Sequence, residues 1–164
     1  MNWVNSDLLF LPVGGSEEIG MNANLYHYED KWILVDLGIS FPDETDLGVD
    51  VLLPDFDFIQ SLGDKFLGIF LTHGHEDHIG AIAHLWPQLE CNIYATPFTA
   101  VLIKEKFKEK HIDITKHLKI VQLNGTINLD PFKIEYITLT HSILEPNGLR
   151  IETPAGVILH TGDW

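Results

Sequence analysis

The chain has 164 residues, of which 45% are hydrophobic and 21% charged, a balance typical of one globular domain with a substantial core and not of a disordered segment. The formal net charge of −14 is unevenly placed, because residues 1–90 carry 16 acidic residues against two lysines. This acidic first half argues against broad electrostatic binding of nucleic acid by the segment alone, although it suits a site that collects cations.

The chain begins with MNWVNSDLLFLPVGG, which lacks the basic start of a signal peptide and whose apolar run is only as long as a strand. No apolar run in the sequence is long enough to span a bilayer. The single cysteine, Cys91, excludes an intrachain disulfide and is expected to be a buried, small apolar residue. We therefore expect a cytoplasmic protein without membrane contact.

Short apolar runs alternate with helical patterns along the chain, which predicts a mixed α/β (α+β) fold. The predicted strands are LLFLPV (8–13), NANLYHY (22–28), KWILVDL (31–37), FLGIFLT (66–72), NIYAT (92–96), LKIVQL (118–123), FKIEYITLT (132–140), LRIET (149–153) and GVILHT (156–161). Helical spacing extends from His78 to Leu89 and from Pro97 to Lys110. The segment ETPAGV (152–157) is predicted to form a hairpin turn.

Three histidines and two carboxylates fall within residues 73–78, directly after a predicted strand. At this spacing the histidines cannot share one helix face, so the cluster is expected on a strand-to-helix loop at the carboxyl end of that strand. Imidazole and carboxylate are the usual zinc ligands where cysteine is absent. The pattern HxHxDH therefore predicts a metal site. Its candidate ligands are His73, His75, Asp77 and His78.

Two metals about 3.5–4 Å apart can share a hydroxide, but they need more ligands than one such loop offers. His141 and Asp163 each follow a later predicted strand and could supply more. The other histidines lack this context and are expected to be structural or exposed. They are His27, His84, His111, His117 and His160.

At these residues the sequence resembles a known family. THGHEDH (72–78) is similar to the signature of the metallo-β-lactamase fold, and the chain more narrowly resembles the N-terminal part of ribonuclease J, a bacterial member of the β-CASP branch. The resemblance extends over nearly the whole chain in the family's order. The segments are LPVGGSEEIGMN (11–22), WILVDLGISFPDE (32–44), GVDVLLPDF (48–56), THGHEDHIGAI (72–82), LTHSILEPNGLRIETPAG (139–156) and HTGDW (160–164).

The resemblance implies an αββα sandwich that binds two divalent metal ions, zinc by ligand type, with manganese as the alternative. It implies that His73, His75 and His141 hold one metal. It also implies that Asp77 and His78 hold the other and that Asp163 bridges the two, so that Asp77 and Asp163 are the catalytic carboxylates. Asp36, in VDLG, would orient the loop through hydrogen bonds to the ligands.

The activity implied by the resemblance is that of a metal-dependent ribonuclease, both 5′-to-3′ exonuclease and endonuclease, in RNA processing and decay. A metal-activated hydroxide would attack the phosphodiester. The resemblance also implies RNA as the partner of the complete protein, a homo-oligomer in its full-length form and no DNA specificity. Glu17, Leu144, Glu145 and Trp164 depart from the family pattern near the site and bear on substrate fit more than on metal binding.

The family pattern continues past HTGD into a β-CASP domain and a returning segment that completes the sandwich. We therefore expect residues 1–164 to be the N-terminal part of a metallo-β-lactamase domain, a fragment with little activity alone and with an exposed sheet edge or apolar face. Two alternatives stay open. One is a small-molecule thioester or lactone hydrolase on the same fold, and the other is a truncated, non-enzymatic chain that binds metal or a partner.

Overall fold

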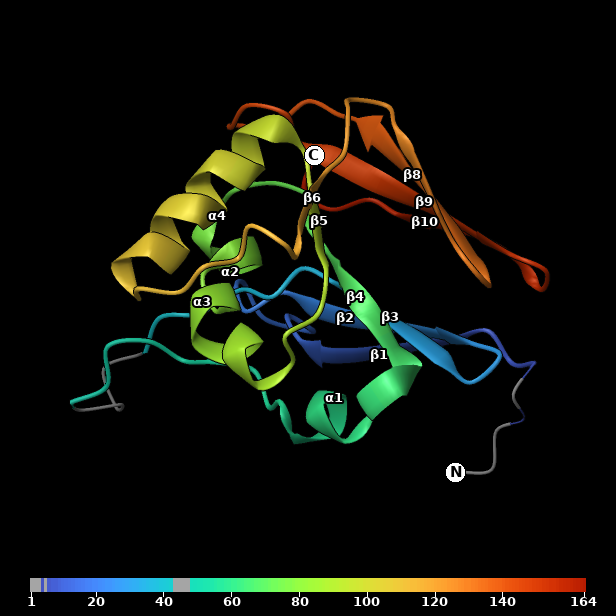
Figure 1. The fold of residues 1–164 in the computed structure, drawn as a ribbon, viewed down its shortest axis with the longest axis horizontal. Coiled ribbons are helices and arrows are strands. Elements are labelled where there is room, and N and C mark those ends of the chain that lie inside the picture. Colours follow the sequence, from blue (N-terminus) through green and yellow to red (C-terminus); the bar gives the residue numbers. More distant parts are fainter. Residues whose placement is uncertain (1–3, 5, 43–47) are drawn as a thin grey trace.

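The computed structural model describes residues 4, 6–42 and 48–164, so the first three residues, residue 5 and the end of the WILVDLGISFPDE segment lie outside the described residues. The strands are β1 (Leu9–Gly14), β2 (Ala23–Tyr28), β3 (Lys31–Val35), β4 (Phe66–Phe70), β5 (Ile93–Ala95), β6 (Leu118–Ile120), β7 (Thr126–Leu129), β8 (Phe132–Thr138), β9 (Asn147–Thr153) and β10 (Gly156–His160). The helices are α1 (Asp57–Ser61), α2 (Glu76–Ile79), α3 (Ile82–Leu85) and α4 (Pro97–Glu109), with 3-10 turns η1 (Gly63–Lys65) and η2 (Trp86–Gln88). Figure 1 shows their arrangement.

The strands form two sheets. The first has the order β1-β2-β3-β4-β5-β6, antiparallel from β1 to β3 and parallel from β3 to β6. Its inner parallel strands β3, β4 and β5 are nearly continuous apolar runs, as expected for strands that are covered on both faces. In β3, for example, every residue from Trp32 to Val35 is buried.

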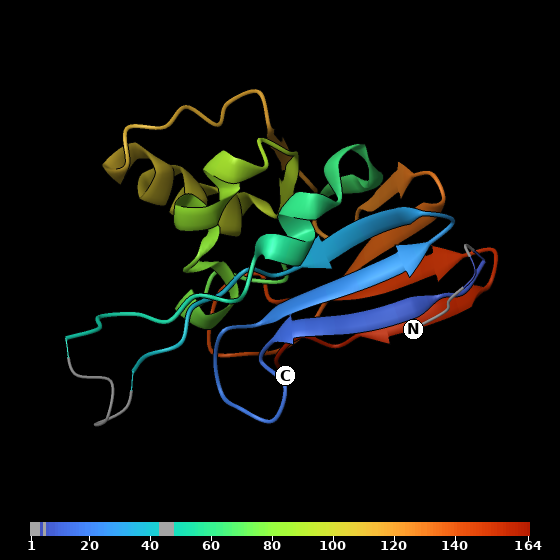
Figure 2. The same cartoon turned by 90° about the horizontal axis from the view of Figure 1, so that it is seen from below.

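The second sheet, β10-β9-β8-β7, is antiparallel throughout and packs face to face against the first (Figure 2). Strand β8 alternates in burial with the period of two that a strand imposes, so that Phe132, Ile134 and Tyr136 point inward. They meet Ile33 and Phe70 of the first sheet in one apolar cluster. This cluster is the core between the two sheets.

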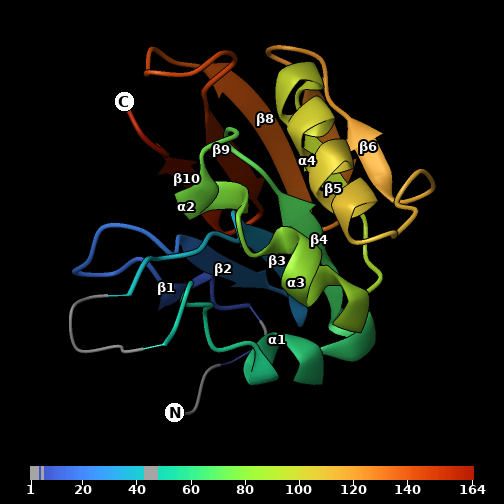
Figure 3. The same cartoon turned by 90° about the vertical axis from the view of Figure 1, so that its left-hand side faces the viewer.

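The helices lie together on the other face of the first sheet (Figure 3). Ile82 of α3 and Ile103 and Phe107 of α4 join Leu34 and Ile69 of the sheet in a second apolar cluster. The order of layers is therefore helices, six-stranded sheet, four-stranded sheet. This mixed α/β architecture confirms the predicted fold class, with three of the four layers of an αββα sandwich in the described part of the chain.

The outer face of the second sheet carries apolar side chains that are open to solvent. Val157 is 54% exposed, Leu159 61% and the terminal Trp164 86%. Leu159 and Trp164 line a hollow of about 360 Å³ together with Ile137 and Leu139. The sequence predicted an exposed sheet edge or an exposed apolar face. The structure has the apolar face, and no helix of the described residues covers it.

Each predicted strand overlaps an observed strand, and the ends of the two differ by up to three residues. The helical spacing from His78 to Leu89 corresponds to a run of short helical pieces and not to one continuous helix. The chain forms the short pieces α2, α3 and η2. The Ala81 amide donates to the Leu37 carbonyl and not to Asp77, whose carbonyl accepts from Asn22, and Pro87 has no amide hydrogen to donate. The sequence analysis also missed α1 and β7, of which β7 has only two apolar side chains in its four residues.

Among the described residues, no helix combines the length and the apolar character that a membrane crossing requires. The single cysteine, Cys91, is free and partly buried, and burial raises the pKa of its thiol to about 12. This state fits the expectation of an unreactive, packed cysteine.

Candidate metal centre

The predicted cluster begins where two parallel strands end side by side. Strand β3 pairs with β4 in the register that places Val35 opposite Phe70. Asp36 and the segment from Thr72 therefore leave the sheet at the same edge. His73 and His75 follow β4 on an irregular loop, and the cluster continues into the short helix α2, which contains Asp77 and His78.

The loop is tied to the segments on either side by backbone hydrogen bonds. The Leu37 amide donates to the His78 carbonyl at 2.8 Å, and the Asn22 amide donates to the Asp77 carbonyl at 2.9 Å. Between them, a side chain at Gly38 would place its Cβ 1.7 Å from the Asp77 carbonyl oxygen, so that only glycine fits. The Asn22 side-chain amide donates to the same Asp77 carbonyl at 3.2 Å. These contacts give a physical reason for the sequence DLG and for the asparagine after GM.

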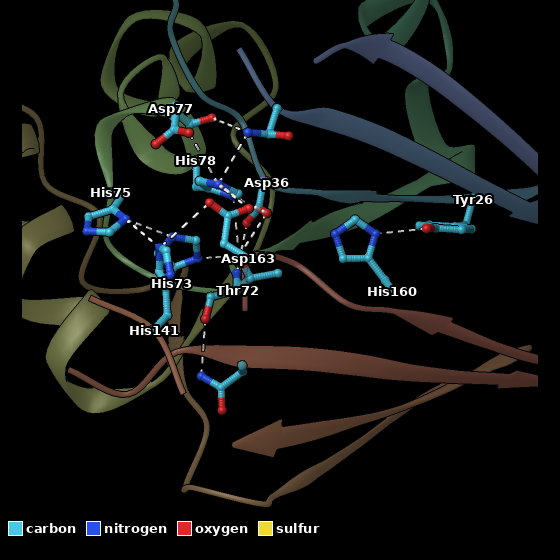
Figure 4. A network of polar contacts seen from close by, with 12 residues as sticks. Tyr26, Asp36, Thr72, His73, His75, Asp77, His78, His141, His160 and Asp163 are labelled. Carbon is cyan, nitrogen blue, oxygen red and sulfur yellow. Dashed lines mark hydrogen bonds and ion pairs between the residues drawn. The ribbon is translucent and has the colours of Figure 1, made fainter. Parts of the chain in front are cut away.

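The second sheet brings two further residues to this edge. His141 follows β8 and Asp163 follows β10. Asn147, at the start of β9, holds this sheet to the loop, because its backbone amide and its side-chain amide both donate to the Thr72 carbonyl at 3.1 Å. Figure 4 shows the residues that converge.

The first group comprises His73, His75 and His141. Each offers one ring nitrogen, and these three nitrogens lie within 4.8 Å of one another. The Nδ1 atom of His75 is 3.1 Å from Nε2 of His73 and 3.2 Å from Nε2 of His141. One lone pair or one proton on that nitrogen cannot satisfy both contacts, whereas a cation can bind all three lone pairs. The donor set therefore fits a divalent metal.

The second group comprises His73, His78 and Asp163, again within 4.8 Å. The two carboxylate oxygens of Asp163 divide between the groups. One is 3.4 Å from Nε2 of His78 and the other is 3.6 Å from Nε2 of His141. Asp77 lies beside this group, with its carboxylate 3.5 Å from the same His78 nitrogen. Asp163 thus has the position that a bridging ligand would need.

Asp36 lies beneath the cluster and is completely buried. Its carboxylate accepts hydrogen bonds from the backbone amide and the hydroxyl of Thr72, and from Nδ1 of His78, each at 2.8 Å. With Nδ1 donating to Asp36, it is Nε2 that loses its proton when His78 becomes neutral, so the lone pair of the neutral ring faces the second group.

The pKa values of the two buried histidines move in opposite directions. Burial lowers the pKa of His78, but the charge of Asp36 and the hydrogen bond to it outweigh burial and raise that pKa to about 9. Burial, followed by the charge of His78, lowers the pKa of His73 to about 4. Conversely, burial raises the pKa of Asp36, but the His78 charge and hydrogen bond bring it below its ordinary value.

The structure thus brings all seven predicted site residues to one edge, although their roles as ligands stay a prediction. The sequence analysis missed Thr72, Asn22 and Asn147, which hold the cluster from behind. The amide of Asn22 also lies 3.2 Å from Nε2 of His78. Their only sequence signal was their place in segments that the family resemblance had marked. His160, expected to be structural or exposed, lies close enough to Asp36 that the carboxylate charge acts on its pKa.

Comparison with known proteins gives three matches of note. Ribonuclease J from Sinorhizobium meliloti is 42% identical over 166 residues, which cover 98% of this chain and 29% of that protein. Ribonuclease J from Helicobacter pylori strain 26695 is 43% identical over 154 residues, which cover 93% of this chain and 22% of that protein. The chain therefore spans less than a third of the length of these relatives.

The third match is a solved structure, the metallo-β-lactamase fold protein YhfI from Bacillus subtilis. It superposes with a TM-score of 0.63 at 19% identity, covering 96% of this chain and 63% of that one, which shows a shared fold. A family model, described as the metallo-beta-lactamase superfamily, matches residues 19–163. That range contains every residue of the two groups described above. This chain therefore belongs to the metallo-β-lactamase superfamily.

Proposed function

We propose that this chain is the metal-binding part of a metal-dependent ribonuclease. One structural observation supports the proposal most directly: two three-residue groups share His73 at the edge of the sheets and are linked by the Asp163 carboxylate. The likeness to ribonuclease J over nearly the whole chain supports RNA as the substrate. The proposal includes residues 1–164 as the N-terminal part of the domain, with a β-CASP domain in the remaining length.

In this proposal the first site consists of His73, His75 and His141, and the second of Asp77 and His78, with Asp163 between them. Two divalent ions held there would lower the pKa of a water to give hydroxide at neutral pH and would stabilise negative charge on the phosphate oxygens. Zinc suits the imidazole and carboxylate donors, and manganese is the alternative.

The chain's own residues prepare this chemistry in three ways. Asp36 fixes the ring of His78 with Nε2 toward the site. The lowered pKa of His73 keeps that ring neutral and able to ligate at physiological pH. Asp77 and Asp163, the proposed catalytic carboxylates, are part-exposed and can meet a substrate that approaches the sheet edge.

The proposal extends to both 5′-to-3′ exonucleolytic and endonucleolytic cleavage, to a homo-oligomeric complete protein and to action in the cytoplasm without DNA specificity. The acidic first half of the chain is no obstacle, because bound cations would face the phosphates. Contacts with the rest of the RNA would then belong to the remaining length of the protein.

The test uses the complete natural protein and two RNA substrates. A 3′-labelled RNA with a 5′ monophosphate reports loss of nucleotides from the 5′ end, and a circular RNA reports internal cleavage. The double variant His73→Ala/His75→Ala should lose both activities and bound metal, while His84→Ala, outside the cluster, should keep them. Turnover of a thioester or lactone with intact RNA would contradict the proposal.

A further inference from the structure

The candidate metal centre is built by two sheets that have to be held in register. The first sheet supplies Asp36 and the HxHxDH segment, and the second supplies His141 and Asp163. Apolar packing between the sheets is not directional, so it does not by itself orient a particular polar side chain. Hydrogen bonds across the sheets are directional and can fix the two halves to within a few tenths of an ångström.

The His141 side of the second sheet has such a link, since Asn147 binds the Thr72 carbonyl. Asp163 lies on the other strand, three residues beyond the end of β10 at His160. Among the described residues, the polar contacts of the Asp163 carboxylate are with His78 and His141 alone, at 3.4 and 3.6 Å. These distances are too long for strong hydrogen bonds, so the position of Asp163 depends on what holds β10.

The end of β10 is held by a buried tyrosine of the opposite sheet. The hydroxyl of Tyr26, in the middle of β2, lies 2.9 Å from Nδ1 of His160, and the two rings meet edge to face at 6.0 Å (Figure 4). Tyr26 is only 4% exposed and packs in the core between the sheets. Its ring position is therefore set by the first sheet, and its hydroxyl anchors the strand that leads to Asp163.

The protonation states agree with this geometry. Burial, with the charge of Asp36 as a second cause, raises the pKa of Tyr26 to about 12, so the hydroxyl keeps its hydrogen. Burial lowers the pKa of His160, so the ring is neutral and its Nδ1 can accept. In the tautomer with its hydrogen on Nε2, His160 accepts at Nδ1 from the Tyr26 hydroxyl. The backbone continues through Gly162, where a Cβ would lie 3.0 Å from the Asn147 carbonyl oxygen.

We infer that Tyr26 and His160 are positioning residues: their hydrogen bond across the sheets holds the end of β10 so that Asp163 reaches both metal sites. This inference rests on the proposed function, because it assigns the pair a role in metal binding. A positioning role of this hydrogen bond differs from a purely structural role in one respect. A lost structural bond weakens the fold as a whole, whereas a lost positioning bond weakens the metal site that needs Asp163.

The chain offers a matched control. Tyr136, in β8, is also a fully buried tyrosine between the sheets, and its hydroxyl donates to the Tyr94 carbonyl at 3.0 Å. Tyr26→Phe and Tyr136→Phe each remove one hydroxyl and one cross-sheet hydrogen bond. They should therefore destabilise the fold to a similar degree, and a difference between them in metal affinity isolates the positioning effect.

The experiment titrates Co²⁺ into the chelator-treated complete protein and follows visible absorption, which resolves the two sites. In Tyr26→Phe, we expect the second site, where Asp163 joins Asp77 and His78, to bind Co²⁺ about 10- to 100-fold more weakly, the range for loss of an outer partner of a ligand. The first site keeps its three histidines and should weaken less. Tyr136→Phe should match the wild type at both sites. His160→Ala should resemble Tyr26→Phe, and His160→Asn, whose Oδ1 can replace Nδ1 as acceptor, should restore most of the affinity.

Equal Co²⁺ affinities in Tyr26→Phe and Tyr136→Phe, whether both normal or both weakened, would overturn the inference while leaving the proposed function intact. A wild-type protein that binds no Co²⁺ would overturn the proposed function and this inference with it. The variants Tyr26→Phe and His160→Ala act on the same bond, so the double variant should bind no more weakly than either single one.

Discussion

Replacing Asp36 with asparagine should damage both the fold and the second of the two proposed metal sites. The carboxylate is completely buried and accepts three hydrogen bonds, from Thr72 N, Thr72 Oγ1 and His78 Nδ1, all at 2.8 Å. An asparagine offers one oxygen and one amide group in its place. Whichever way it turns, its amide hydrogens face either the Thr72 donors or the His78 ring.

The magnitude follows from the buried pair. Removing one partner of a buried ion pair typically costs about 3–5 kcal/mol, because a charge is left without compensation. Here His78 can lose its proton and accept from the new amide, so we expect a smaller loss, about 2–3 kcal/mol in free energy of unfolding. That relief places the ring hydrogen on Nε2, the atom that faces Asp163, and should weaken metal binding about 10- to 100-fold.

The assay is urea unfolding in a chelator, followed by Co²⁺ titration of the folded variant. Asp30→Asn is the matched control, because Asp30 pairs with Lys65 at 2.9 Å but both side chains are about half exposed. Such a surface pair contributes about 0–1 kcal/mol. If Asp36→Asn unfolds within about 0.5 kcal/mol of the wild type and binds Co²⁺ normally, then the reasoning from the buried pair is refuted.

Three further predictions follow from the same contacts. In a chelator, stability against urea should peak near pH 6.5. The stabilisation from protonated His78 is complete below the pKa of the unfolded chain and is lost as pH rises through about 9, whereas His73, neutral in the fold, makes stability fall as pH drops from about 6.5 toward 4. An equal urea midpoint at pH 6.5 and 9 would contradict this. Gly38→Ala should lower the unfolding free energy by about 1–3 kcal/mol or more, measured by urea unfolding, because its Cβ would overlap the Asp77 carbonyl. Lys106→Met should change stability by less than about 1 kcal/mol and leave Co²⁺ affinity unchanged, since its partner Glu76 is half exposed and belongs to neither metal group; a tenfold loss of affinity would show that this ion pair holds α2 in place.

Most of the sheet architecture was predictable because the strands carry their own signal. Strands β3 and β4 are short apolar runs bounded by polar residues, and both are buried as those runs predict. The errors occur where the local pattern is ambiguous. From His78 to Leu89 the apolar spacing suits one helix, but the Ala81 amide donates to the Leu37 carbonyl, so a hydrogen bond to a distant segment and the proline at position 87 decide the path.

The candidate site was predictable to the extent that its residues are local. His73, His75, Asp77 and His78 share one motif, and their spacing alone indicated metal binding. His141 and Asp163 could be named only as residues that follow strands, because nothing in the sequence says which sheet edge those strands reach. The antiparallel pairing of β8, β9 and β10 places both residues at that edge.

The residues that escaped prediction have one physical property in common: each acts across a boundary between segments that are distant in sequence. Asn147 reaches Thr72, and Tyr26 reaches His160, 134 positions away. Taken alone, an asparagine before a glycine suggests a turn and a tyrosine in an apolar strand suggests core packing. Only the folded chain reveals that both have a polar atom aimed at the opposite sheet. A metal site assembled from two sheets needs such links, because its ligands have to be held in position by directional contacts as well as by apolar packing. We therefore expect that a buried tyrosine or asparagine at the sheet interface beside such a site can affect metal affinity. Its effect on metal affinity should be measured before the residue is assigned to the core.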